Sequence, residues 1–86
     1  MKILLMEDDE ILNDVIKMQL ESKGYEVTSV YDGDEAESAI CESNFDLLLL
    51  DVNVPSINGF DLLTNLRTNS ITTPSIFITS LMIPKI

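Results

Sequence analysis

Acidic side chains stand at two places where an apolar run of the sequence ends. The run "ILLM" leads directly into Glu7, Asp8 and Asp9, and the run "LLLL" at 47–50 leads into Asp51. Short, continuous apolar runs are typical of strands that are buried on both faces, so these carboxylates would follow the ends of two such strands. If the two strands are neighbours in a parallel sheet, Glu7, Asp8 and Asp51 converge in one crevice.

Three converging carboxylates would repel one another, and one of them would have a raised pKa unless a cation lay among them. Mg²⁺ is a hard ion that prefers oxygen ligands, and it keeps several water molecules that a phosphate group can displace. The arrangement therefore indicates a Mg²⁺ site that handles a phosphoryl group.

Each of these residues also has an ordinary interpretation when it is taken alone. An Asp after a strand is most often a cap or turn residue, and "EDDE" is most often the solvated start of a helix. Asn58-Gly59 is typical of a hairpin turn, although a helical pattern follows it, and Thr79 alone is an ordinary strand residue. The functional interpretation is favoured because all these polar residues fall at the same edge of the predicted sheet.

The elements that would position these residues alternate between strand and helix patterns. Apolar positions at a spacing of three and four residues predict helices, and short apolar or β-branched runs predict strands. Asp9 and Gly24 are suited to begin and end the first helix. In chain order we predict a strand at 2–6, a helix with Leu12, Ile16 and Leu20 (beside Ile11, Val15 and Met18), a strand at 25–31, a helix with Ala36, Ala39 and Ile40 inward, a most deeply buried strand at 45–51, a helix with Leu62, Leu63 and Leu66, and a strand at 72–80.

This order predicts an open α/β fold. Strands that are separated by helices pair in parallel through right-handed crossovers, which place helices on both faces of the sheet. Ligands bind to such sheets beyond the carboxyl ends of the strands, where the strand order reverses. The predicted carboxylate cluster lies at that edge.

Composition and charge restrict the class of protein further. The 86 residues allow a single domain, 1–86, and fifteen acidic residues against five basic ones give a net charge of −10. This charge argues against direct binding to nucleic acid or to an anionic membrane, and it suits a cation or a basic partner. The N-terminal apolar run is too short for a signal peptide or a membrane span, so we expect a cytoplasmic protein, in which Cys41 is a small buried hydrophobe.

The motifs resemble the response-regulator receiver domain of two-component signalling. "ILLMEDDE", "GYEVTSVYDGDEA", "LLLLDVNVPSINGFDLL" and "IFITS" match that family in order and in spacing over residues 2–80. The resemblance implies a flavodoxin-like fold with strand order 2-1-3-4, a Mg²⁺ cofactor, and a phosphoryl group received from a sensor histidine kinase. It implies a signalling module rather than a turnover enzyme.

The resemblance also implies roles for individual residues. Asp51 would be the phosphoacceptor, and Thr79 would donate a hydrogen bond to the phosphoryl group. Pro55 and Gly59 would shape the loop into the third helix. The implied Mg²⁺ ligands are Glu7, Asp8, Asp51 and the backbone carbonyl of Asn53, with Asp8 a more direct ligand than Glu7.

The sequence departs from the family after the fourth predicted strand. The family continues with a helix, a fifth strand that ends in Lys-Pro, and a closing helix, whereas "LMIPKI" follows Ser80 here. One interpretation is a truncated domain that lacks the last helices and most or all of the fifth strand. The other is that "MIPKI" resembles the end of the fifth strand and brings Lys85 to the phosphoryl group. We favour truncation, because six residues leave no room for a helix and Ile86 follows Lys85.

Two other functions remain open on the residues alone. A Mg²⁺-dependent phosphohydrolase of the haloacid-dehalogenase type also uses an Asp nucleophile at a strand end, but it carries a second Asp where this chain has Asn53. A protein-interaction fragment that is not phosphorylated is the third hypothesis. A truncated sheet would leave the fourth strand at an edge, so we also expect a homodimer through that edge or through the uncovered face of the sheet.

Overall fold

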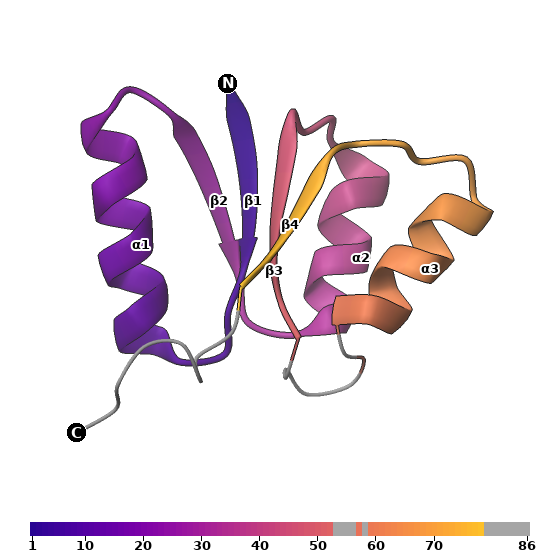
Figure 1. Cartoon of the computed structure of the whole chain (residues 1–86). Helices are drawn as coiled ribbons and strands as arrows, with labels where there is room; N and C mark the ends of the chain where they lie inside the picture. Colours follow the sequence, from indigo (N-terminus) through magenta and orange to yellow (C-terminus); the bar gives the residue numbers. More distant parts are fainter. Residues whose placement is uncertain (53–56, 58, 79–86) are drawn as a thin grey trace.

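The computed structural model describes residues 1–52, 57 and 59–78, and these residues form a layered α/β sheet (Figure 1). Strands and helices alternate along the chain, as the sequence predicts. Their bounds are β1 Lys2–Met6, α1 Glu10–Ser22, β2 Glu26–Val30, α2 Gly33–Glu42, β3 Leu47–Asp51, α3 Gly59–Thr68 and β4 Ser75–Ile78. Among these helices, none is long and apolar enough to cross a membrane.

The four described strands run parallel in the order β2-β1-β3-β4. This confirms the predicted flavodoxin-like order, in which the chain turns back past its first strand to add the third. β1 has its predicted bounds, while β2 and β3 are each two residues shorter than predicted. The consequence for the site is that β1 and β3 are direct neighbours, with Met6 in register with Leu50.

Local signals in the sequence set the ends of the first two helices. Asp9 is the N-cap of α1, where its side chain accepts a hydrogen bond from the Leu12 amide, and Asp32 does the same for α2 through the Glu35 amide. After α1, Gly24 has a φ angle of +91°, a conformation that costs glycine little, and its amide donates to the Glu21 carbonyl. These caps fix where α1 begins and ends and where α2 begins.

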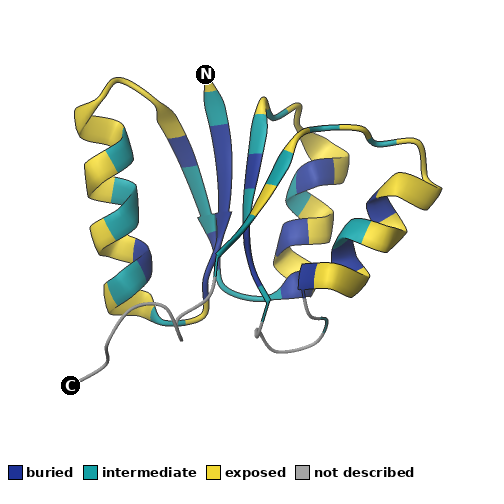
Figure 2. Cartoon of the chain, in the orientation of Figure 1, coloured by how far each residue is buried: buried dark blue, intermediate teal, exposed yellow. Residues whose placement is uncertain are grey.

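Helices cover both faces of the sheet, with α1 on one side and α2 and α3 on the other (Figures 1 and 2), and the buried side chains form two separate cores. The larger core lies under α2 and α3, and the smaller core lies under α1. The larger core is formed by Leu4, Met6, Val30, Ala36, Ile40, Leu48, Leu50, Leu62 and Leu66, and the smaller by Ile3, Leu5 and Val27 with Ile16 and Leu20 packed against them. The inward positions predicted for α2 are therefore confirmed, and Leu62 and Leu66 of α3 belong to the same core.

The structure corrects two predictions about burial. Cys41 is exposed rather than buried. α2 packs on the sheet through the face that carries Ala36 and Ile40, and Cys41, the next residue after Ile40, lies outside that face. Among the described strands β1, rather than β3, is the most deeply buried: Leu47 and Leu49 of β3 point to the α1 side and are only partly covered. Burial on that side depends on where α1 lies, which the leucine run does not reveal.

The outward side of α1 carries apolar residues as well. Ile11, Val15 and Met18 are all exposed, whereas Leu12, Ile16 and Leu20 are partly buried. The apolar positions of α1 thus divide between the sheet and the surface.

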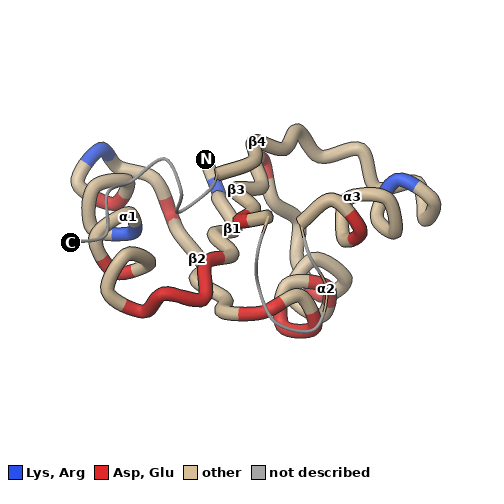
Figure 3. The backbone as a smooth tube through the Cα atoms, turned by 60° about the horizontal axis from the view of Figure 1, so that its bottom comes forward, with Lys and Arg blue, Asp and Glu red and all other residues tan. Residues whose placement is uncertain are grey.

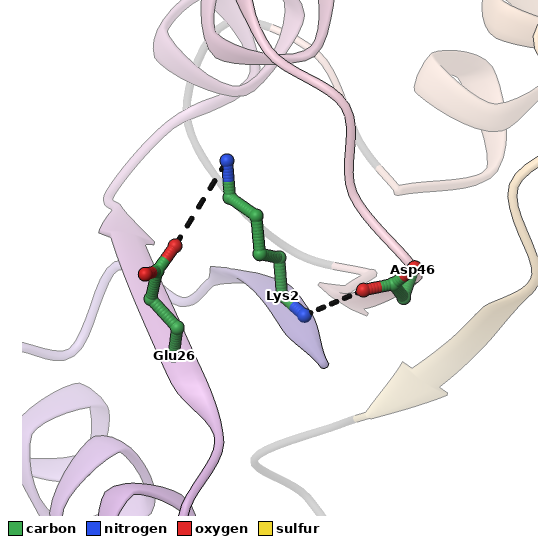
Figure 4. Close-up of polar contacts among 3 residues, drawn as sticks. All are labelled: Lys2, Glu26 and Asp46. Atoms are coloured by element: carbon green, nitrogen blue, oxygen red, sulfur yellow. Dashed lines mark hydrogen bonds and ion pairs between the residues drawn. The ribbon is translucent and has the colours of Figure 1, made fainter.

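The amino ends of three strands are joined at Lys2, at the opposite edge from the carboxylates (Figure 4). Its backbone amide donates to the Asp46 carboxylate at 2.7 Å, and its Nζ lies 3.9 Å from the carboxylate of Glu26. An exposed ion pair of this kind contributes little stability. The neighbouring backbone bond from the Asp46 amide to the Lys2 carbonyl, at 2.8 Å, contributes to the alignment of β1 with β3.

Candidate functional site

Glu7, Asp8 and Asp51 converge at the carboxyl edge of the sheet, as predicted from their positions after β1 and at the end of β3. One carboxylate oxygen from each residue lies within 4.8 Å of the other two. Glu7 and Asp51 are each only 1% exposed, while Asp8 is exposed to solvent. Glu7 and Asp51 therefore form the buried part of the cluster, and Asp8 lies on its solvent-exposed side.

The surroundings of the cluster are acidic as well. Figure 3 turns this edge of the molecule forward and shows acidic segments at the starts of α1 and α2. Burial raises the pKa of Glu7 to about 7, with Asp51 and Asp8 adding to the rise and the hydrogen bond from the Asp9 amide opposing it. Without a cation, the cluster thus holds a proton on Glu7 close to neutral pH.

The donor set fits a hard divalent cation. The Oε2 atom of Glu7 is buried and accepts no hydrogen bond from the residues that the structure describes. Leaving a buried carboxylate oxygen without a partner is costly, and a cation would provide one. Carboxylate oxygens are the ligands that Mg²⁺ prefers, and the exposed Asp8 leaves the site open to solvent and phosphate on one side.

Hydrogen bonds hold the turn between β1 and α1 that carries two of the acids. The Glu7 amide donates to the Val30 carbonyl at 3.2 Å, and the Asp9 amide donates to Oε1 of Glu7 at 3.0 Å. Asp9 in turn caps α1. Asp8 therefore lies between two residues whose backbone amides are both hydrogen-bonded.

Asn13 takes part in this network and was missed by the sequence reasoning. It is fully buried on α1, and its Nδ2 donates to the carbonyls of Glu7 at 3.0 Å and Val30 at 3.2 Å. A signal for it exists in the sequence, because Asn13 is three residues before Ile16 and seven before Leu20, on the side of the helix that packs on the sheet. A polar residue at such an inward position requires buried hydrogen-bond partners.

The phosphoacceptor candidate is held from the opposite side by α3. Gly59 begins α3 so close to β3 that a Cβ atom there would lie 2.7 Å from the Asp51 carbonyl oxygen. The Gly59 amide also donates to the Val52 carbonyl at 3.4 Å. The prediction that Gly59 shapes the entry into the third helix is thus consistent with a close backbone approach that only glycine permits.

Other predicted site residues lie outside the described part of the chain. These are Asn53 and Pro55 of the loop after β3, Thr79 after β4, and Lys85. What the structure does provide is the register of β4, in which Ile78 pairs with Asp51.

Comparison with known proteins agrees with this architecture. The family model described as "Response regulator receiver domain" matches residues 3–83. The transcriptional regulatory protein CrdR of Helicobacter pylori is 44% identical over 81 residues, which are 93% of this chain and 38% of that protein. The chain thus spans a little over a third of the length of that curated relative.

Solved receiver structures share the fold. The receiver domain of the Francisella response regulator 1452 superposes with a TM-score of 0.90 at 35% identity, covering 93% of this chain and 66% of that one. The response regulator TrrA of Thermotoga maritima, solved in complex with Mg²⁺ and BeF, has a TM-score of 0.86 at 28% identity, covering 92% of this chain and 69% of that one.

An open parallel sheet with an acidic cluster at its carboxyl edge defines a class of α/β domains that carry a candidate cation site. Within that class, the chain belongs to the response regulator receiver domain family, which is a family of signalling domains. The phosphohydrolase alternative is not favoured by these comparisons.

Proposed function

We propose that Asp51 accepts a phosphoryl group from a phosphohistidine of a sensor histidine kinase, with Mg²⁺ as the cofactor. The observation that carries this proposal is the meeting of the buried Glu7 and Asp51 with the exposed Asp8 at the carboxyl edge. The family membership of the chain and the Mg²⁺ in the TrrA complex give it further support.

The reaction needs few groups from the protein. A carboxylate oxygen of Asp51 attacks phosphorus in line, so that a new P–O bond forms while the P–N bond to the imidazole of the donor breaks. The electron pair of the broken bond leaves with the imidazole. Bound Mg²⁺ would offset the negative charge of the phosphoryl oxygens and of the acids around them.

The other proposed contacts surround the acceptor. We assign the Mg²⁺ ligands to Glu7, Asp8, Asp51 and the backbone carbonyl of Asn53. We assign a hydrogen bond to the phosphoryl group to the hydroxyl of Thr79, which directly follows the register partner of Asp51. Lys85 would add an ion pair to the phosphoryl group under the less favoured interpretation of the "MIPKI" segment.

The test is intact-mass spectrometry after exposure of the chain to phosphoramidate with Mg²⁺. We expect the mass of one acid-labile phosphoryl group, and Asp51→Asn should remove it. Asp46→Asn is the matched control, because Asp46 is an exposed acid just before the same strand, at the far edge of the sheet. Equal phosphorylation of Asp51→Asn and the unmodified chain would refute the assignment.

We further propose that the chain associates with a second copy along β4. Among the described strands, β4 pairs with β3 on one side and forms an edge of the sheet. Ile76 on β4 is 52% exposed, and Phe60, whose ring centroid is 4.5 Å from that of Phe77, is 58% exposed. An apolar strand edge of this kind is open to pairing with another strand.

A further inference from the structure

We propose that Asn13 is a positioning residue that sets the geometry of the Mg²⁺ ligands Glu7 and Asp8. This inference rests on the proposed function, because it assigns to a buried amide of α1 the task of holding the acidic turn. Asn13 is assigned an indirect role, because its donated hydrogen bonds go to the backbone carbonyls of Glu7 and Val30.

The hydrogen bonds of Asn13 link three elements beside the acids. Its Nδ2 reaches the Glu7 carbonyl just after β1 and the Val30 carbonyl at the end of β2, while its own backbone lies on α1. Because both partners are carbonyl oxygens, the orientation of the amide group follows from chemistry: the NH₂ end must face them. The position of the Glu7 backbone is thereby linked to the position of α1 on the sheet.

The same bonds close a ring around Asp8. The backbone amide of Asn13 donates to the Asp9 carbonyl at 2.8 Å, and the backbone amide of Asp9 donates to Oε1 of Glu7 at 3.0 Å. The side chain of Asn13 completes the ring by donating to the Glu7 carbonyl. Asp8 is the residue enclosed by this ring, and it is exposed, so packing contributes little to its position. Its backbone geometry therefore depends on the hydrogen bonds on either side of it.

Removing the Asn13 side chain would release the turn at one point. The Glu7 carbonyl would lose its bond from Nδ2, whereas the Val30 carbonyl would keep the bond from the Glu7 amide. Groups that orient metal ligands without touching the metal typically contribute about 10- to 100-fold in metal affinity. We expect the loss to fall on Mg²⁺ binding beyond any general loss of stability.

The first experiment compares Asn13→Ala with Leu20→Ala. Leu20 lies on the same helix and packs on the smaller core, so its truncation loosens α1 on the sheet without touching the ring around Asp8. Calorimetric titration with MgCl₂ should show binding about tenfold weaker for Asn13→Ala than for the unmodified chain. Leu20→Ala should lower the melting temperature and leave the Mg²⁺ affinity close to that of the unmodified chain.

The second experiment needs no variant to fold. In the unmodified chain, the side-chain amide resonances of Asn13 in a ¹⁵N spectrum should shift on titration with MgCl₂, because Asn13 holds the carbonyl of a ligand residue. Unshifted Asn13 resonances, or an unchanged affinity in Asn13→Ala, would overturn the inference. Absence of Mg²⁺ binding in the unmodified chain would instead contradict the proposed function itself.

Discussion

Three chemically similar acids differ at the residue scale because the fold places them at different depths. Glu7 and Asp51 are buried at the ends of adjacent strands, and Asp8 is one residue farther along, where the turn has left the sheet. Burial opposes charge on Glu7, and the exposed Asp8 keeps the site open to solvent. The same three residues thus combine carboxylate repulsion, which a cation would relieve, with an exposed side at Asp8, through which phosphate would reach the cluster.

At this scale, the stability of the metal-free chain should fall as the pH rises from about 5 to about 7. The pKa of Glu7 is raised from 4.5 to about 7, so in this range the folded chain keeps a proton that the unfolded chain has lost. The folded chain then binds more protons than the unfolded one, and the free energy of unfolding decreases with rising pH. Urea unfolding at a series of pH values in the presence of a chelator would measure the decrease.

Glu7→Gln provides the control for this prediction. The uncharged amide of this variant cannot lose a proton. The decrease in the free energy of unfolding between pH 5 and pH 7, the range set by the raised pKa of Glu7, should therefore largely disappear. Adding Mg²⁺ at pH 7 should raise the melting temperature of the unmodified chain, because the ion binds only the folded form. An identical pH dependence in Glu7→Gln would show that Glu7 does not carry it.

At the scale of elements, the site depends on how closely α3 approaches the end of β3. Gly59 is buried at the first position of α3, and its missing side chain lets the helix backbone lie against the Asp51 carbonyl. On the other side, the cap at Asp9 and the bonds of Asn13 fix where α1 begins. Two helix starts on opposite faces of the sheet therefore determine the position of the acids between them.

Gly59→Ala should destabilise the chain, although Gly to Ala inside a helix ordinarily stabilises by about 0.5–1 kcal/mol. The new Cβ would lie 2.7 Å from the Asp51 carbonyl oxygen, so either α3 or the end of β3 must move. Phosphorylation of Asp51 should also slow. Urea unfolding and the rate of mass gain with phosphoramidate measure the two effects.

Asn65→Ala is the matched control, because Asn65 is an exposed position in the middle of the same helix. There the change should be neutral or slightly stabilising, since Ala has the higher helix propensity. A Gly59→Ala chain that is as stable and as readily phosphorylated as Asn65→Ala would argue against the importance of the close approach.

At the scale of the whole molecule, charge and apolar surface act in opposite directions. The net charge of −10 opposes association between copies, but at physiological salt the repulsion is screened beyond about 8 Å. The exposed Ile76 and Phe60 beside the β4 edge favour association over short distances. Short-range burial can therefore outweigh the long-range repulsion.

We expect a homodimer in light scattering at micromolar concentration and physiological salt. Ile76→Lys should shift the population to monomer, because a lysine on an edge strand adds a charge that disfavours strand pairing. Met18→Lys is a matched control, since Met18 is 69% exposed and lies on α1, away from β4. A monodisperse monomer for the unmodified chain would contradict the proposed association.

Local patterns in the sequence were sufficient to predict the order of the elements. The bounds of β1, the cap at Asp9 and the inward face of α2 depend on residues that are close together in the chain, and all are confirmed. The acids at the ends of two apolar runs indicated a cation site, because parallel strands end at a common edge. The family resemblance supplied the strand order that makes β1 and β3 neighbours, and the structure confirms it.

Only the tertiary structure decided which side chains are buried and which polar groups meet. Cys41 follows two inward residues yet is exposed, and Asn13 is a polar residue of α1 yet is fully buried. The approach of the acids to within 4.8 Å likewise depends on the register of β1 against β3. The physical reason is that burial and hydrogen-bond partners depend on which elements pack together, whereas helix and strand patterns depend on neighbours in sequence.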